Sequence, residues 1–168
     1  MKPGIVIILG AAVTALLLDH ATAAVILAPV GPNPSGLRNP ATTGQLEVFS
    51  ALKWRTEGNN PPWHQHTGYY LYNEQGRELR RVDNTVGYYA QAPRVVSLPA
   101  GRYWIKARAK NIFWLKVPVV IQPGAVTKVH LDGDWKPLAN TSSTAIVSAP
   151  AGYPVGWRSN LASATGAD

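Results

Sequence analysis

The chain has 168 residues and a formal net charge of +7, with 16 Lys and Arg against 9 Asp and Glu. It contains no cysteine, which excludes thiol catalysis, thiolate metal sites and disulfide bonds. The length fits one domain with its own hydrophobic core, and the excess of basic residues points to anionic partners.

The first 23 residues have the three parts of a secretory signal peptide. Lys2 gives a positive start, residues 5–18 form an unbroken apolar run, and residues 21–23 (Ala-Thr-Ala) are a small-x-small cleavage site. The apolar run is shorter than the roughly 20 residues that a membrane-spanning helix needs. We therefore predict cleavage near Ala23 and export to the periplasm, the cell envelope or the extracellular space; an uncleaved membrane anchor is the alternative.

The first part of the exported chain is rich in proline and glycine. Residues 24–43 are predicted to form an extended, poorly ordered lead-in, with an edge strand within residues 25–30 as the alternative. A strand is predicted from Gly44 to about Leu52, because apolar and polar residues alternate there. Residues 53–66 contain Gly, Asn and Pro in succession and are predicted to form a long loop.

Further strands follow in the middle of the chain. Residues 67–72 are rich in tyrosine, residues 73–76 have turn composition, and residues 78–82 resume an extended pattern, which together predict a hairpin. Residues 83–93 are predicted to connect this hairpin to a strand over residues 94–98. Helical periodicity is not convincing anywhere after the signal peptide.

The clearest pattern is the alternation of apolar and polar residues from Val95 to Leu131. It predicts a strand over residues 102–110, then a second whose inward side chains are Phe113, Leu115, Val117, Val119 and Ile121. A third strand is predicted with residues 127, 129 and 131 inward. Pro-Ala-Gly at residues 99–101 and Gln-Pro-Gly-Ala at residues 122–125 are predicted to be the turns between them.

These elements predict an all-β chain with about seven short strands. We expect a single seven-stranded, two-sheet β-sandwich over residues 44–133. Residues 134–168 have low complexity and are predicted to be a mostly flexible tail. Residues 153–157 are the only cluster of large side chains in that tail, and docking of this cluster on the sandwich is the alternative.

The motif Val-Ser-Leu-Pro-Ala-Gly-Arg-Tyr at residues 96–103 precedes Val-Val-Ile at 119–121, Pro-Gly at 123–124 and a closing Val-x-Leu at 129–131. This combination resembles carboxypeptidase-regulatory-like domains and the related PEGA-type and transthyretin-like (prealbumin-like) modules. The resemblance covers residues 44–133. It implies an immunoglobulin-like sandwich of two sheets that serves as a non-catalytic module.

The outward positions of the alternating strands carry many basic and aromatic residues. If consecutive strands pair as hairpins, these side chains share one cationic face, which would suit an anionic polymer or head groups. A plain solvated face is the alternative, because outward charges keep exposed strands soluble. The candidate ligand-binding residues on the strands are Trp104, Lys106, Arg108, Trp114, Lys116 and Lys128, with Lys110 and His130 nearby.

The six tryptophans support a second hypothesis. Trp63, Trp104 and Trp114 lie in loops or at outward strand positions, so they are candidates for a carbohydrate-binding platform. Packing of these rings in the core or at sheet ends is the alternative for each.

A third hypothesis is a metal-dependent hydrolase. His64 and His66 form a His-x-His pair whose two imidazoles could reach one metal ion, although no third ligand is evident. Two solvated loop histidines are the simpler interpretation. No catalytic residue, cofactor or firm metal site is predicted.

The sequence therefore predicts an exported, non-enzymatic β-sandwich module with a binding or scaffolding role. The expected partner is an anionic envelope polymer, a polysaccharide or another envelope protein. Nucleic acid is not expected as a partner, because export separates the protein from it.

Overall fold

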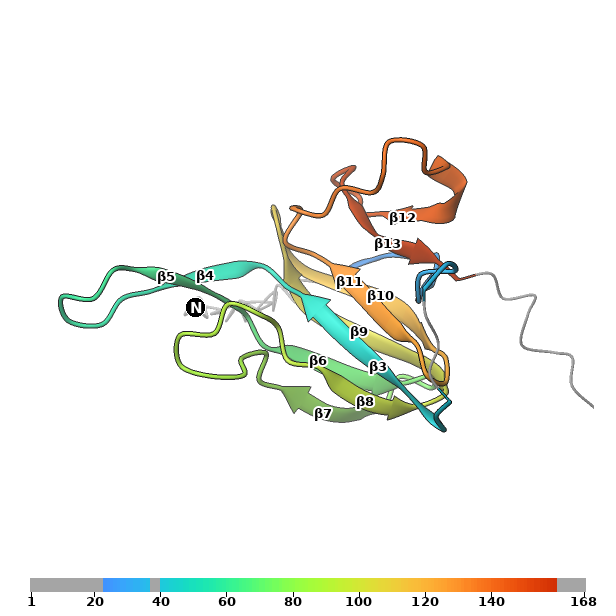
Figure 1. Cartoon of the computed structure of the whole chain (residues 1–168), viewed down its shortest axis with the longest axis horizontal. Helices are drawn as coiled ribbons and strands as arrows, with labels where there is room; N and C mark the ends of the chain where they lie inside the picture. Colours follow the sequence, from blue (N-terminus) through green and yellow to red (C-terminus); the bar gives the residue numbers. More distant parts are fainter. Residues whose placement is uncertain (1–22, 37–39, 160–168) are drawn as a thin grey trace, which may run out of the picture.

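The computed structural model describes residues 23–36 and 40–159, so nearly all of the predicted signal peptide lies outside the described residues (Figure 1). The described residues form β-strands and one short 3₁₀ helix, η1 (Ser143–Ala145), and none of them is in an α-helix. The prediction of an all-β chain is confirmed. The strands are β1 (Ala24–Val25), β2 (Val30–Gly31), β3 (Thr43–Phe49), β4 (Leu52–Arg55), β5 (Trp63–His66), β6 (Tyr69–Asn73), β7 (Glu78–Val82), β8 (Val96–Pro99), β9 (Gly101–Ala109), β10 (Ile112–Ile121), β11 (Val126–His130), β12 (Ile146–Ser148) and β13 (Pro154–Arg158).

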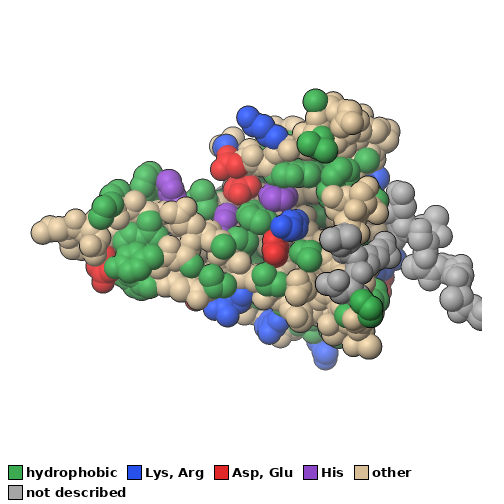
Figure 2. All heavy atoms as spheres, in the orientation of Figure 1, with side chains coloured by type: hydrophobic (Ala, Val, Ile, Leu, Met, Phe, Trp, Pro, Cys, Tyr) green, Lys and Arg blue, Asp and Glu red, His purple; other side chains and the backbone are tan. Residues whose placement is uncertain are grey.

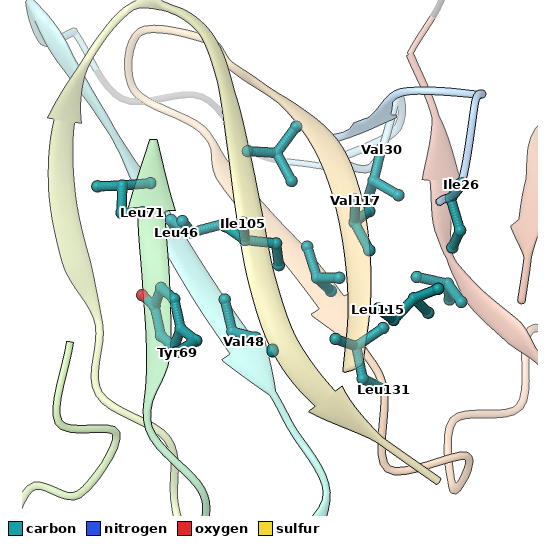
Figure 3. Packing of buried hydrophobic residues seen from close by; sticks show 14 of the residues in the cluster. Ile26, Val30, Leu46, Val48, Tyr69, Leu71, Ile105, Leu115, Val117 and Leu131 are labelled. Carbon is teal, nitrogen blue, oxygen red and sulfur yellow. The ribbon is translucent and has the colours of Figure 1, made fainter. Parts of the chain in front are cut away.

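The strands form two facing sheets and a projecting arm (Figure 1). Sheet A has the order β12-β13-β2-β10-β9-β6-β7, with β1 also paired to β10, and sheet B has the order β11-β3-β8. Both sheets contribute to one buried cluster, which includes Leu46 and Val48 of β3 and Ile105, Leu115 and Val117 of sheet A (Figure 3). The fold is therefore β-sandwich-like, with its core between sheets A and B.

The alternation of polarity sets which side chains enter this core. In β10, Leu115, Val117, Val119 and Ile121 are at most 2 % exposed. Burying one such side chain stabilises the fold by roughly 1.5–3 kcal/mol. In β9, Ile105, Ala107 and Ala109 are buried as well and Tyr103 is half-buried, and in β11 Thr127 and Val129 are buried.

One predicted core residue is on the surface. The pairing of β9 with β10 shifts register between Ile112 and Leu115, and Phe113 is 63 % exposed. A bulge adds a residue to one strand and reverses the side to which the preceding side chain points. The prediction that Phe113 faces the core is therefore wrong.

The prediction of a long loop over residues 53–66 is also wrong. β4 and β5 pair as an antiparallel hairpin that projects from the sandwich as the arm (Figure 1). The Gly, Asn and Pro residues that suggested a loop occupy only its tip. The Arg55 Nε donates to Gln65 Oε1 at 3.1 Å across the hairpin.

The sandwich extends beyond the predicted boundaries of residues 44–133. β1 and β2 pair in parallel with β10, and Ile26 and Val30 of this lead-in join the core. In the predicted tail, β12 and β13 form a hairpin that pairs with β2, and Val147 and Val155 are at most 1 % exposed. The lead-in and this part of the tail are therefore ordered parts of sheet A, and residues 153–157 dock on the sandwich.

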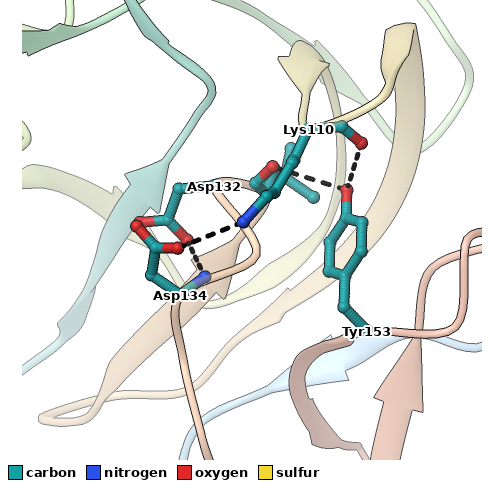
Figure 4. Close-up of polar contacts among 5 residues, drawn as sticks. Lys110, Asp132, Asp134 and Tyr153 are labelled. Carbon is teal, nitrogen blue, oxygen red and sulfur yellow. Dashed lines mark hydrogen bonds and ion pairs between the residues drawn. The ribbon is translucent and has the colours of Figure 1, made fainter.

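A polar cluster ties the C-terminal hairpin to the rest of the fold (Figure 4). The Tyr153 hydroxyl is placed to donate to the main-chain oxygens of Lys110 at 3.3 Å and Leu131 at 3.4 Å. The Lys110 ammonium lies 3.4 Å from the Asp134 carboxylate. These contacts join the β9–β10 turn, the end of β11 and the start of β13.

The β9–β10 turn gives a first prediction. Asn111 has a φ of 61°, a left-handed backbone conformation that residues with a Cβ rarely adopt. We expect Asn111→Ala to lower the free energy of unfolding by about 1 kcal/mol, and Asn111→Gly to leave it unchanged or raise it slightly. Urea denaturation of the three proteins measures this difference; equal destabilisation by both substitutions would contradict it.

Candidate functional site

The outward side of sheet A gathers aromatic and basic side chains from three adjacent strands. Lys106 of β9 is paired with Tyr70 of β6 on one side and with Lys116 of β10 on the other. Trp104 is paired with Tyr72 in the next row. Directly paired residues point to the same side of a sheet. We call this surface the outer face; it consists of Tyr70, Tyr72, Trp104, Lys106, Arg108, Phe113, Trp114 and Lys116.

Aromatic rings hold the basic groups of the outer face in place. The Lys116 Nζ lies 4.7 Å from the centre of the Trp104 ring, and the Lys106 Nζ lies 5.5 Å from that of Trp114. The Arg108 guanidinium lies 4.6 Å from the Phe113 ring. Each cation–π contact contributes about 0.5–1 kcal/mol at an exposed site. The charges are therefore positioned by the rings beneath them.

None of these charges forms an ion pair among the residues that the structure describes. The described ion pairs are Arg102 with Glu74, Lys110 with Asp134 and Lys128 with Glu47. Like charges directly opposite each other in a sheet are destabilising, yet Lys106 and Lys116 are direct neighbours. The outer face thus carries several cations that form no ion pair, although Glu78, which is paired with Tyr72, lies on the same side of the sheet.

The positive charge continues from the outer face to the arm. The pKa of Lys53 in β4 is lowered, first by partial burial, then by Arg55 and, more weakly, by Arg81 and Arg108, against the opposing effect of Asp83. Repulsion between Lys53 and these arginines requires that they lie near one another. Lys53 therefore lies within electrostatic range of Arg55 and Arg108, with the carboxylate of Asp83 also in range.

Five of the predicted ligand-binding residues are brought together on this face: Trp104, Lys106, Arg108, Trp114 and Lys116. Lys128 is not among them, because β11 belongs to sheet B and pairs in parallel with β3. Its ammonium lies 3.2 Å from the Glu47 carboxylate. The expectation that Lys128 and His130 share the outer face is wrong, because it assumed that β10 and β11 pair as a hairpin.

The surface of sheet B has a different character. In the view of Figure 2, basic, acidic and histidine side chains are intermixed at its centre. His130 stacks between Phe49 and Trp135, with ring centres 4.4 and 5.0 Å away. A groove of about 520 Å³ lies beside them, lined in part by Trp135, Lys136 and Trp157. The neighbouring Lys128 is neutralised by Glu47, so this groove lacks the concentrated charge of the outer face.

Trp63, the remaining predicted ligand-binding residue, is only 8 % exposed. Its indole N–H donates to the Tyr88 main-chain oxygen at 3.1 Å, and its ring packs against those of Tyr88 and Tyr89. The prediction of an open platform at Trp63 is therefore wrong. The exposed rings of the arm region are Trp54, Tyr88 and Tyr89, at 65 %, 58 % and 59 %.

The sequence offered one signal for these tyrosines. Val86-Gly87-Tyr88-Tyr89 places two large rings in a connection that has no strand pattern of its own, where they have no sheet face to cover. Only the fold shows that this connection packs on the arm, because residues 85–88 and β5 are distant in the chain.

The two histidines of the His-x-His pair have separate partners. The His64 ring lies 3.8 Å from that of Trp54, and His66 Nδ1 lies 2.7 Å from the Ser50 main-chain oxygen. Within residues 23–36 and 40–159, no group of three His, Cys, Asp or Glu residues is placed to hold a metal ion.

His130 gives a second prediction. Burial, with smaller effects of Lys128 and His66, lowers the pKa of His130 from 6.5 to about 4. Between these two pH values the unfolded chain binds a proton that the folded chain does not, so stability is lost as the pH falls through this window. The loss attributable to His130 is at most about 3 kcal/mol.

We therefore expect His130→Phe to lose less stability than the wild type between about pH 7 and pH 4. The phenylalanine ring keeps the stacking with Phe49 and Trp135 but does not titrate. Urea denaturation at several pH values measures the difference. Parallel pH dependence of the two proteins would contradict the buried, neutral state of His130.

None of the helices in the described parts of the chain is long and apolar enough to cross a membrane. No family model, no curated protein and no solved structure matches this chain. The functional conclusion therefore depends on the geometry and charge of the surfaces themselves.

Proposed function

We propose that this chain is an exported, non-enzymatic β-sandwich module that binds an anionic polymer of the cell envelope or the extracellular space through its outer face. The observation that carries the proposal is the set of three ring-supported cations, Lys106, Arg108 and Lys116, none of which forms an ion pair among the described residues. A repeating anionic ligand neutralises this charge and removes the repulsion between the two paired lysines.

The arrangement favours an anionic ligand over a neutral carbohydrate. Sugar rings stack on aromatic faces that are open to solvent, but Lys116 lies over Trp104 and Lys106 lies over Trp114. Trp63, the third ring of the carbohydrate hypothesis, is buried. The outer face therefore presents positioned positive charges to a ligand, and the basic side chains cover the tryptophan rings that a neutral sugar would need.

The fold and the leader sequence support the remaining parts of the proposal. Two facing sheets are also what the resemblance to carboxypeptidase-regulatory-like and transthyretin-like modules implies, although that resemblance implies seven strands, whereas sheet A has eight strands and sheet B has three. Residues 1–23 have the composition of a cleaved signal peptide. A module of this type would act in the envelope or outside the cell by binding or scaffolding.

Affinity chromatography tests the proposal. The chain, purified after export, is applied to matched gels that carry polygalacturonate or a neutral dextran. We expect retention on the polyanion at low salt and elution as the salt approaches about 1 M, where the Debye length falls to about 3 Å. Equal retention of the protein on both gels would support the carbohydrate hypothesis instead. If the protein were retained on none of a panel of gels that carry different polyanions, the proposal would be contradicted.

A further inference from the structure

A second concave site lies at the arm. The hairpin β4–β5 and residues 85–88 enclose a cleft of about 350 Å³, lined by Arg55, Thr56, Trp63, Gln65, Thr85 and Tyr88. A volume of this size is at the lower end of the range for small-ligand sites. It suits one or two sugar units.

The cleft combines one fixed cation with aromatic walls and hydroxyl groups. The Arg55 Nε is engaged by Gln65 Oε1, and Gln65 in turn donates to the Tyr88 main-chain oxygen. These bonds orient the guanidinium and leave its two terminal amino groups for a ligand. Among the described residues, Arg55 forms no ion pair. A guanidinium with two free amino groups binds a carboxylate in a bidentate manner.

The other groups of the cleft match the rest of an acidic sugar. Tyr88, which is 58 % exposed, supplies ring surface for the apolar C–H face of a pyranose, and Thr56 and Thr85 supply hydroxyls for its oxygens. Beside the cleft, the Glu57 carboxylate accepts from the Tyr89 hydroxyl at 3.4 Å.

The cleft and the outer face are connected along the chain. The Ala51 N–H donates to the Arg108 oxygen at 2.9 Å, and β4 continues from there through Lys53 to Arg55. Four residues of strand span about 13 Å. An extended ligand of at least this length can therefore contact Arg55 and Arg108 together, with Lys53 between them.

We infer that the cleft is a subsite for a uronic acid unit, and that the polymer bound by this protein is a linear acidic polysaccharide that runs from the arm onto the outer face. The inference rests on the proposed function, since the outer face supplies the second half of the path. The combination of a carboxylate-binding guanidinium, ring walls and hydroxyls selects a sugar acid over a polyphosphate, which would need only charge.

Calorimetric titration with digalacturonate and with long polygalacturonate distinguishes binding at the cleft from binding at the outer face. We expect the wild type to bind both ligands, and Arg55→Gln to lose at least tenfold in affinity for the disaccharide. Arg55→Lys keeps the charge but not the bidentate geometry. On a logarithmic scale, its loss of affinity relative to the wild type should therefore be more than half of the loss in Arg55→Gln. Arg77→Gln, at the exposed β6–β7 turn, is the matched control and should bind like the wild type.

The double variant Lys106→Gln/Lys116→Gln distinguishes a failure of this inference from a failure of the proposed function. It should bind the disaccharide within twofold of the wild type but lose affinity for the polymer. The indole N–H resonance of Trp63, followed by NMR, reports directly on the cleft and should shift with digalacturonate but not with neutral cellobiose. Absence of disaccharide binding by the wild type, or unchanged binding by Arg55→Gln, would overturn the subsite even if the polymer is bound normally.

Discussion

Replacing Lys106 and Lys116 together by glutamine is expected to lower the affinity for polygalacturonate by roughly thirtyfold at low salt. An exposed ion pair contributes up to about 1 kcal/mol, and two such pairs, about 2 kcal/mol together, correspond to roughly thirtyfold in the dissociation constant. Ordering of both ammonium groups by Trp104 and Trp114 favours the upper end of this range, because less side-chain entropy is lost on binding. Stability should rise slightly, because the substitution removes two like charges from directly paired positions.

The matched control removes the same charge from the other sheet. Lys128 and Lys136 lie beside the groove of sheet B, and Lys128 is already paired with Glu47. The variant Lys128→Gln/Lys136→Gln has the same net charge as the outer-face variant. If both doubles lost affinity equally, binding would depend on overall charge and not on the outer face.

Val155→Asp is expected to destabilise the fold by about 4 kcal/mol or more. Val155 of β13 is fully buried and belongs to the main core cluster, although it lies in the part of the chain that was predicted to be a flexible tail. A carboxylate at this position would be buried without a partner, which is among the costliest single changes. Since many domains have a total stability of about 5–15 kcal/mol, the variant should unfold readily.

Thermal and urea denaturation measure this effect, with Val86→Asp as the matched control. Val86 is 57 % exposed in the loop beside the arm, so the same substitution there should change the stability by less than about 0.5 kcal/mol. If Val155→Asp were as stable as Val86→Asp, β13 would not be an integral strand of sheet A.

Local patterns predicted the strands and their inward faces well. From Val95 to Leu131, the alternation of apolar and polar residues predicted which sides of β9, β10 and β11 are buried. The turns that contain Pro and Gly predicted where these strands end. Phe113 is the exception, because a one-residue bulge is invisible in the polarity of neighbouring residues.

Pairing between distant segments was not predictable in the same way. β3 pairs with β11, and β2 pairs with both β10 and β13, across long sequence separations. Strands of two to five residues such as β2 and β13 carry too few side chains for a clear alternation. An edge strand within residues 25–30 and docking of residues 153–157 were therefore only alternatives, and no local pattern indicated their place in sheet A.

The candidate site was predictable to the extent that it depends on one hairpin. β9 and β10 are adjacent in the chain and pair antiparallel, so Trp104, Lys106 and Lys116 fall on one face as expected. The position of Lys128 depends on which sheet contains β11, and the burial of Trp63 depends on how residues 85–88 pack on the arm. Neither of these is encoded in a local pattern, so both predictions were wrong.

Chemical-shift mapping of the ¹⁵N-labelled protein during titration with a polygalacturonate oligomer tests the central claim most directly. We predict that the perturbed amides and indoles lie on β6, β9 and β10, centred on Tyr70, Trp104, Lys106 and Lys116, and that β3 and β11 remain unperturbed. Perturbations centred on His130 and Trp135 of the sheet B groove, or no perturbation at saturating oligomer, would contradict the assignment of the outer face as the binding surface.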